Sequence, residues 1–139
     1  MTTITSESNR WKSAAAVVLG LVVVVVLSNG TDQVLHATRV FPPSDQRMSD
    51  GLFGLALAYR IVAQVFGAWL TARFAPRNPM KHAWVLGAIG FVLSIAGIVA
   101  SVVTDLGPAW YAVALAVSAL PSAWLGGAIY TRSAERRAA

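Results

Sequence analysis

The stretch AWVLGAIGFVLSIAGIVASVVT, residues 83–104, carries no charged side chain over 22 residues. A helix of that length rises about 33 Å, which is enough to cross the roughly 30 Å hydrocarbon core of a bilayer. Only helices and closed barrels satisfy all their backbone hydrogen bonds in lipid. The stretch therefore predicts a transmembrane helix, and the remaining apolar runs decide the fold class.

Three more apolar runs predict helices at about 12–35, 49–74 and 108–131. The composition agrees, because 56% of the 139 residues are hydrophobic and 12% are charged, whereas soluble domains carry roughly 25% charged residues. The short connections leave no room for a separate soluble domain. We predict an all-α membrane protein, in which residues 1–139 form a single four-transmembrane-helix bundle with up-down-up-down order.

The first run has two readings. A basic leader precedes the 14 apolar residues 14–27, and small residues follow at Ser28 and Gly30, which is the pattern of a cleaved signal peptide. The other reading is a retained helix over 12–35, whose polar outer third must face other helices or water. With cleavage, three helices remain and Asp32 leaves the membrane.

The basic residues are distributed unevenly about the predicted spans. Eight lie in the amino-terminal segment, the segment between the second and third helices, and the tail, which share one side in a four-span chain. The opposite side has Arg39 and Arg47, and Arg60 lies inside a span. Cytoplasmic segments collect Lys and Arg, so we predict a multi-pass inner-membrane protein with both termini cytoplasmic. These residues mark helix ends and form no basic stripe, so the net charge of +5 predicts no nucleic-acid partner.

Small residues recur along the last two predicted helices at alternating spacings of four and three. They are Ala83, Gly87, Gly90, Ser94, Gly97 and Ser101 in the third helix, and Ala112, Ala116, Ala119, Ala123 and Gly126 in the fourth. In lipid, close approach of two backbones supplies much of the helix–helix contact energy. This helix-packing seam predicts a close antiparallel pair, with a ligand path along the same seam as the alternative. Pro121 predicts a bend in the fourth helix.

Arg60 lies near the middle of the second predicted span. Its backbone is 10 residues after Asp50 and 13 before Arg73, a depth at which arginine costs about 2.5 to 3.5 kcal/mol on insertion scales. Such residues face the bundle interior or a watery cavity. Asp32, in the first span, is the natural partner. Contact requires it to lie about one turn deeper than residue counting gives, so the pairing stays open.

Polar residues surround this expected pair. The candidate intramembrane polar site consists of Asn29, Asp32, Gln33, Arg60 and Gln64. One interpretation is an outward-facing pocket that holds an anion or relays a proton. The other is a structural ion pair that fixes the helix arrangement. Tyr59 is next to Arg60 on another helix face, and we expect it to be a packing or interface residue.

The two histidines, His36 and His82, flank opposite faces of a core roughly 30 Å thick, so they cannot ligate one haem or metal within a subunit. His36 follows Asp32 by four residues, so the two are a candidate pH-sensitive pair, with a solvated loop histidine as the alternative. The chain has no cysteine, which removes disulfides and thiolate metal sites. We predict no cofactor. No acid pair, serine–base arrangement or phosphate-binding glycine loop has useful spacing, so we do not expect an enzyme.

Four short stretches carry a resemblance to known proteins. They are Gly30-Thr31-Asp32, Val40-Phe41-Pro42-Pro43, Met48-Ser49-Asp50 and Trp69-Leu70-Thr71-Ala72-Arg73-Phe74-Ala75-Pro76. Through them, nearly the full chain resembles the uncharacterised small four-span bacterial inner-membrane proteins, which implies a location but no activity. Residues 67–77 are also similar to the cytoplasmic loop between the second and third spans of major-facilitator carriers, but the acid of that loop is missing. Small multidrug exporters share only the four-span size.

Two functions fit these features. The first is a non-enzymatic membrane subunit or assembly protein, whose partners are the lipid bilayer and a larger membrane complex. The second is a small transporter or channel, expected as a homo-oligomer because four helices alone enclose little pathway. Exchange of Arg60 for Leu separates the two, because the second function predicts a lost flux and the first an altered stability.

Overall fold

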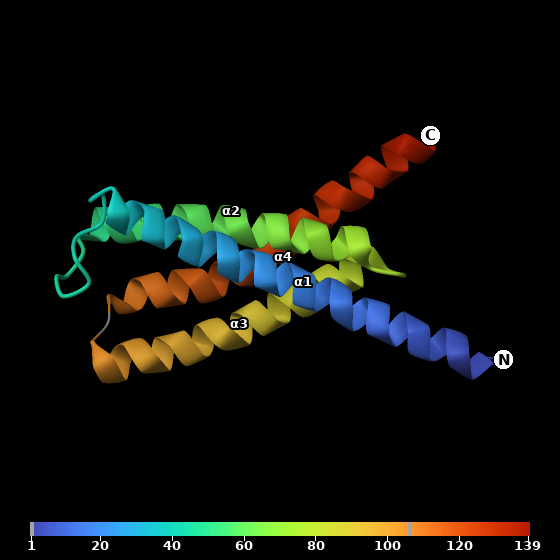
Figure 1. The fold of residues 1–139 in the computed structure, drawn as a ribbon, viewed down its shortest axis with the longest axis horizontal. Coiled ribbons are helices and arrows are strands. Elements are labelled where there is room, and N and C mark those ends of the chain that lie inside the picture. Colours follow the sequence, from blue (N-terminus) through green and yellow to red (C-terminus); the bar gives the residue numbers. More distant parts are fainter. Residues whose placement is uncertain (1, 106) are drawn as a thin grey trace.

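A computed structural model describes residues 2–105 and 107–139 of the chain, and all regular structure in those residues is helical (Figure 1). The elements are α1 (Thr2–Ala37), α2 (Asp50–Phe74), α3 (Pro79–Thr104) and α4 (Ala109–Ala138). Each of the four is long and apolar enough to cross a membrane. The prediction of an all-α, four-helix fold is thereby confirmed.

The helices are longer than the apolar runs that predicted them. α1 begins at Thr2 rather than near residue 12, and α4 continues to Ala138 rather than ending near 131. Both extensions lack glycine and proline, so nothing breaks the helix where the apolar run ends. α3 begins at Pro79, because proline suits the first turn, where its missing N–H would have no helical partner.

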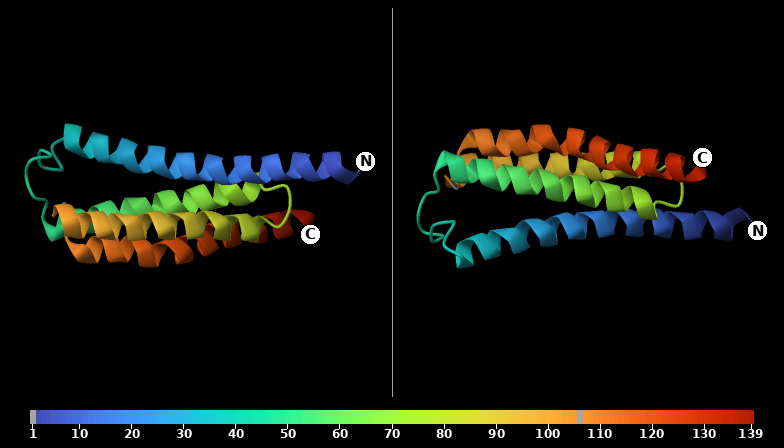
Figure 2. Two further views of the ribbon diagram at one scale, coloured as in Figure 1. Left: turned by 90° about the horizontal axis from the view of Figure 1, so that it is seen from below. Right: turned by 90° about the horizontal axis from the view of Figure 1, so that it is seen from above.

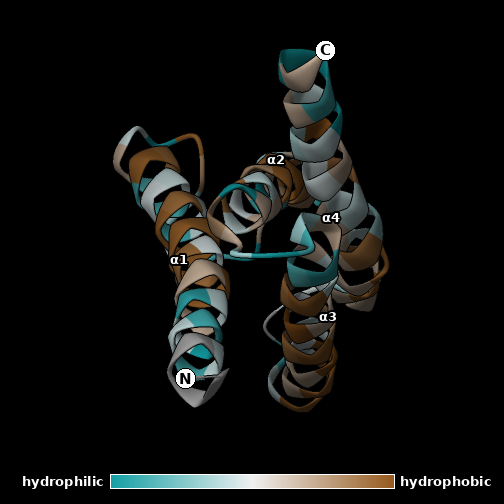
Figure 3. Ribbon diagram, turned by 90° about the vertical axis from the view of Figure 1, so that its right-hand side faces the viewer, coloured by the Kyte–Doolittle hydropathy of each residue, from teal (hydrophilic) through white to brown (hydrophobic). Residues whose placement is uncertain are grey.

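Consecutive helices run in opposite directions, so that α1 begins and α4 ends at one end of the bundle (Figures 1 and 2). We call this the terminal end, and the opposite end, with the 38–49 loop and the α3–α4 turn, the loop end. α2 is the central helix, because α1 packs on one side of it and α4 on the other, with α3 beside α4 (Figure 3). Within the described residues, no Cα atom of α1 lies within 8 Å of a Cα atom of α4.

Small residues bring α4 close to two neighbours. A Cβ added to Gly87 of α3 would lie 2.5 Å from the Cβ of Ala123 in α4. A Cβ on Gly126 would lie 2.7 Å from the Cβ of Ala68 in α2. α4 is a continuous helix through Pro121, and Figure 1 shows it changing direction around its middle, where the proline removes a backbone hydrogen bond. The small residues of α4 therefore join α3 to α2.

A separate close approach joins α1 to α2. A Cβ on Gly20 would lie 2.8 Å from the carbonyl oxygen of Gly67, and one on Gly67 would lie 2.9 Å from the carbonyl oxygen of Gly20. One turn away, the fully buried hydroxyl of Thr71 donates to the backbone oxygen of Ala16 at 3.2 Å. From this crossing towards the loop end, α1 and α3 diverge (Figure 2).

Large apolar side chains cover the outside of the bundle, and small ones fill its interior. The exposed large residues include Val22, Val26, Val62, Val92, Val99, Val102, Val113 and Val117. Eleven of the fourteen buried hydrophobic residues are alanines, namely Ala16, Ala56, Ala63, Ala68, Ala72, Ala83, Ala112, Ala116, Ala119, Ala123 and Ala128. A soluble bundle has the reverse pattern, with its large apolar residues inside. Helices that pack in lipid show this arrangement, because lipid tails solvate large apolar side chains as well as a protein interior does.

Candidate functional site

An ion pair joins α1 to α2 on the loop side of the glycine crossing. Nη2 of Arg60 donates to Oδ2 of Asp32 at 2.5 Å, and the two side chains are 28% and 21% exposed. The hydroxyl of Tyr59 donates to the other carboxylate oxygen of Asp32. The structure thus brings Asp32 and Arg60 into direct contact and adds a second hydrogen-bond donor to the carboxylate.

The contact of Tyr59 with Asp32 corrects the expectation that this tyrosine only packs. Neighbouring residues on a helix point about 100° apart, so a side chain from another helix that lies between them can meet both. The carboxylate of Asp32 lies in that position between Tyr59 and Arg60. The need of a tyrosine hydroxyl for a partner in an apolar segment was the sequence signal that could have indicated this role.

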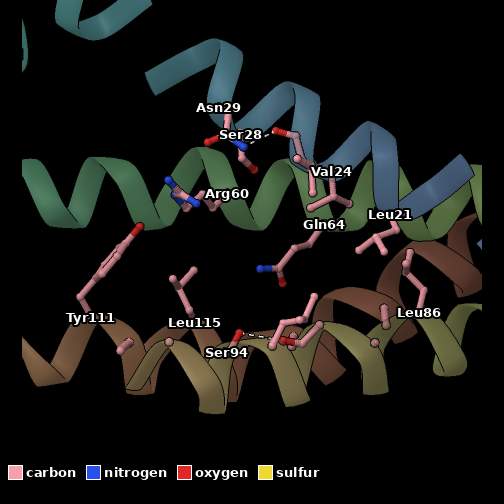
Figure 4. Close-up of a pocket in the computed structure, with 18 of the residues that line it drawn as sticks. Leu21, Val24, Ser28, Asn29, Arg60, Gln64, Leu86, Ser94, Tyr111 and Leu115 are labelled. Carbon is pink, nitrogen blue, oxygen red and sulfur yellow. Dashed lines mark hydrogen bonds between the residues drawn. The ribbon is translucent and has the colours of Figure 1, made fainter. Parts of the chain in front are cut away.

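A cavity of about 390 Å³ lies next to the ion pair and is bounded by all four helices (Figure 4). Its lining is mainly apolar. In Figure 4, α1 and α2 form one side of the cavity with the polar groups of Asn29, Arg60 and Gln64, and α3 and α4 form the other side with Ser94 and Tyr111. The lining residues are Leu21, Val24, Val25, Ser28, Asn29, Phe53, Arg60, Gln64, Ala68, Leu86, Gly87, Gly90, Leu93, Ser94, Gly97, Ser101, Gly107, Pro108, Tyr111, Ala112, Leu115, Ala119 and Ala123.

Two polar atoms of α2 stand out in this lining. Nε of Arg60 and Oε1 of Gln64 are buried and have no hydrogen-bond partner among the described residues. In Figure 4 the carboxamide of Gln64 extends from α2 into the space in front of α3 and α4. A buried polar group without a partner costs about 1–3 kcal/mol. The cavity therefore contains one donor and one acceptor, four residues apart on the same helix, that a bound polar group can satisfy.

The small-residue seam has a different role at each end. Towards the terminal end it is a packing face, because Gly87 lies against Ala123. Towards the loop end it forms a cavity wall, because a Cβ on Gly90 would meet nothing nearer than 3.9 Å and one on Gly97 nothing within 4 Å. The hydroxyls of Ser94 and Ser101 donate to carbonyl oxygens of their own helix at 2.8 Å. Helix packing and a cavity wall thus occupy successive halves of the seam.

Packed side chains stand at both ends of the cavity. At the loop end, the ring of Phe53, which is 7% exposed, lies 5.1 Å from the ring of Tyr111, and a Cβ on Gly107 would be 3.2 Å from it. At the terminal end the buried cluster of Ala68, Ala83, Leu86 and Ala123 packs with Val17 and Leu21. The flank between α1 and α3 is different, because the exposed residues of the described lining, Val25, Asn29, Leu93 and Gly97, all belong to these two helices. The cavity therefore opens laterally, on this flank of the bundle.

Of the two remaining polar residues of the predicted site, one lines the cavity and the other does not. Asn29 lines the cavity, and its amide donates to the carbonyl oxygen of Val25 at 2.9 Å. Gln33 is exposed and lies outside the cavity lining. The structure therefore does not bring Gln33 together with Arg60 and Gln64 in the cavity.

His36 has a partner other than the one expected. Its Nδ1 donates to the carbonyl oxygen of Pro42 at 2.9 Å, and its ring meets the buried ring of Phe41 edge-on at 5.4 Å. No ion pair between His36 and Asp32 occurs in the part of the chain that the structure describes. α1 ends at Ala37 and the chain folds back, which brings the Pro42 carbonyl to the imidazole. The histidine thus fastens the loop.

Comparisons of the chain with protein-family models, with curated proteins and with solved structures find no match. In residues 2–105 and 107–139, no group of three or more acidic or histidine side chains is placed to hold a metal ion. The ion pair and the cavity beside it are therefore the features that bear on function.

Proposed function

We propose that this protein is a multi-pass inner-membrane protein that takes a small amphipathic molecule from the bilayer into the cavity beside Arg60 and Gln64, as a small membrane carrier. The observation that carries the proposal is the pair of unpartnered buried atoms, Arg60 Nε and Gln64 Oε1, in a cavity of about 390 Å³. Ligand sites range from about 300 to 1,000 Å³ and combine an apolar lining with a few convergent polar groups.

The orientation in this proposal has both termini in the cytoplasm and α1 retained as a membrane helix. The excess of basic residues at the terminal end supports the orientation. Retention of α1 is supported by its close crossing at Gly20 and Gly67 and by the ion pair of Asp32, because cleavage near Gly30 would remove the crossing and leave Arg60 without an anion.

Binding accounts for more of the site than a purely structural ion pair does. A structural pair requires the contact between Arg60 Nη2 and Asp32, but it gives no reason for a cavity or for an unpartnered Nε. Native interiors are close-packed, with few voids larger than a water molecule. A cavity of this size, placed against a buried donor and acceptor, is therefore better explained by a ligand.

A membrane subunit or assembly protein is the second candidate. The observation that favours it is the separation of α1 from α4, which leaves a flank of the bundle where another subunit or a second copy of the chain can pack. Under this function the flank binds protein, and the cavity has no small-molecule ligand of its own.

The binding of 1-aminoanthracene, a small fluorescent amphiphile, to the full chain in lipid nanodiscs tests the proposal. Gly97→Phe places a ring in the cavity, because a side chain at Gly97 meets open space. The matched control is Gly54→Phe, since Gly54 is equally open but lies outside the cavity lining. We expect saturable binding by the wild type and by Gly54→Phe, and at least a tenfold loss in Gly97→Phe. Equal binding by both variants would leave the membrane subunit as the better proposal.

A further inference from the structure

We infer that the cavity selects an uncharged, chain-shaped amphiphile whose head is a hydroxyl group, which means an aliphatic alcohol rather than a fatty acid, an amine or a phosphate. The inference rests on the proposed function, because it names the class of molecule that the same cavity takes. Three properties of the cavity carry it: its charge, its hydrogen-bonding atoms and its length.

The charge of the site favours a neutral head group. Among the described lining residues, Arg60 is the only charged one, and its guanidinium is already paired with Asp32. A carboxylate or phosphate in the cavity would add an unbalanced negative charge, and an ammonium an unbalanced positive one. Either charge would have to leave water for an apolar lining without a counter-ion, which is costly.

The two unpartnered atoms call for a head that both donates and accepts. Nε–H of Arg60 needs an acceptor and Oε1 of Gln64 needs a donor. Residues four apart on a helix are neighbours on one face, with about 5–6 Å between their Cβ atoms, so Arg60 and Gln64 both line the same cavity. A hydroxyl has one O–H donor and two acceptor lone pairs on a single atom. An ether or ester oxygen only accepts, and would leave Gln64 Oε1 unsatisfied.

The length of the cavity leaves room for an alkyl tail beyond the head group. On α3 the lining runs from Leu86 to Ser101, a helical rise of about 22 Å. The lining thus extends along most of one helix, so the cavity is elongated along the bundle. From Gln64 to Phe53 along α2 is a rise of about 16 Å, lined largely by apolar groups, in which an alkyl tail can lie.

The lateral position of the opening agrees with this class of ligand. Phe53 and Tyr111 stand at the loop end, and the α1–α3 flank faces the surface that carries the large apolar side chains. A long-chain alcohol is concentrated in the bilayer and can enter from that flank. A soluble anion or cation would arrive through water at one of the packed ends.

Displacement of 1-aminoanthracene by four probes with the same ten-carbon chain tests the inference on the full chain in nanodiscs. The probes are 1-decanol, methyl decyl ether, decanoate and decylammonium. We expect 1-decanol to displace the dye at a concentration about tenfold or more below the other three. Compared with the ether, the alcohol adds one hydrogen bond, to Gln64 Oε1, and compared with the two ions it carries no unbalanced charge into the cavity. Stronger displacement by decanoate or decylammonium, or equal displacement by the ether, would overturn the inference.

Gln64→Leu tests whether Gln64 causes the preference for the alcohol over the ether, because it removes the acceptor while keeping a side chain of similar volume. In this variant we expect 1-decanol and methyl decyl ether to displace the dye within about threefold of each other. Gln33→Leu, which makes the same change at an exposed position outside the cavity, should keep the wild-type preference. Retained dye binding by Gln64→Leu shows that the cavity is intact. A preference that survives in Gln64→Leu would refute this assignment of the head group, and dye binding by the wild type would still support the cavity as a binding site.

Discussion

Arg60 serves two purposes through different atoms of one guanidinium group. Nη2 neutralises Asp32 and so attaches α1 to α2, while Nε lies in the cavity lining without a protein partner. An arginine can do this because its five N–H donors point in fixed, separate directions. A lysine at this position would lack the planar group that reaches both places. Helix attachment and ligand recognition are therefore coupled at one residue.

Asp32→Asn is expected to destabilise the protein by about 3 kcal/mol, because it leaves the Arg60 charge buried without an anion. The double variant Asp32→Asn, Arg60→Leu should recover most of this loss, since replacing both members of a buried pair with uncharged groups is often neutral. The unfolding midpoint in mixed micelles measures both effects. Gln33→Leu, on the same helix but exposed, should stay within about 0.5 kcal/mol of the wild type. A double variant as unstable as Asp32→Asn would contradict this account.

At the scale of single residues, the sequence identified the residues of the site more accurately than it identified the contacts between them. Arg60 and Asp32 could be singled out because charges in apolar runs are rare and costly. The contact of Tyr59 and the exclusion of Gln33 depend on the rotation of α1 against α2, and no single-residue property encodes that rotation. The contact of His36 with Pro42 depends on where α1 ends, which the apolar pattern places only approximately.

At the scale of elements, glycines that look alike in the sequence have opposite roles. Gly20 and Gly67 form the crossing of α1 and α2, where each would bring a Cβ against the backbone of the other helix. Gly30 and Gly54 lie in the same two helices with nothing within 4 Å of an added Cβ. The first two allow close contact, whereas the second two only weaken their helices.

Alanine substitution separates the two kinds of glycine. Gly20→Ala and Gly67→Ala should each cost about 1–3 kcal/mol of folding stability, because the carbonyl oxygens they meet cannot move aside. Gly30→Ala and Gly54→Ala should raise stability by about 0.5–1 kcal/mol, since alanine favours the helix and fills open space. The same unfolding measurement serves all four variants. Stabilisation by Gly67→Ala would rule out the close crossing.

The existence of the four helices was predictable, and their pairing only in part. The length of each apolar run predicted a transmembrane helix, since roughly 20 residues are needed to cross a bilayer. The ends were misplaced because a helix continues into water until a residue breaks it, as in the extension of α4 to Ala138. The small-residue seam predicted the α3–α4 pair. The spacing of the small residues alone could not show that α3 packs closely against α4 at Gly87 but forms an open cavity wall from Gly90 to Gly97.

At the scale of the whole molecule, the central position of α2 could not be read from the order of the chain. Short loops favour contact between consecutive helices, yet α4 packs on α2 as well as on α3. The contact depends on Gly126, which lies against the backbone of α2 near Ala68. In the sequence this glycine belongs to the row of small residues of α4 that was predicted to pack against α3. Only the packed bundle distinguishes the two faces of α4.

The absence of cysteine from the chain makes the orientation directly testable. Single cysteines at Ser8, Ser44 and Asn78 are exposed and lie in α1, the 38–49 loop and the α2–α3 turn. We expect a membrane-impermeant maleimide to label Ser44→Cys in intact spheroplasts, and to label Ser8→Cys and Asn78→Cys only after permeabilisation. The reverse pattern would establish the opposite orientation, and labelling of both Ser8→Cys and Ser44→Cys before permeabilisation would exclude the four-span arrangement.

The dual contacts of α4 have a consequence for how the protein is made. The cavity has walls from all four helices, so the site does not form until α4 has left the ribosome and packed beside α2. A polypeptide terminated prematurely before residue 109 keeps the ion pair and the glycine crossing, and yet lacks one wall of the binding site. Ligand binding would then distinguish molecules in which all four helices have packed together from those in which α4 has not yet joined the bundle.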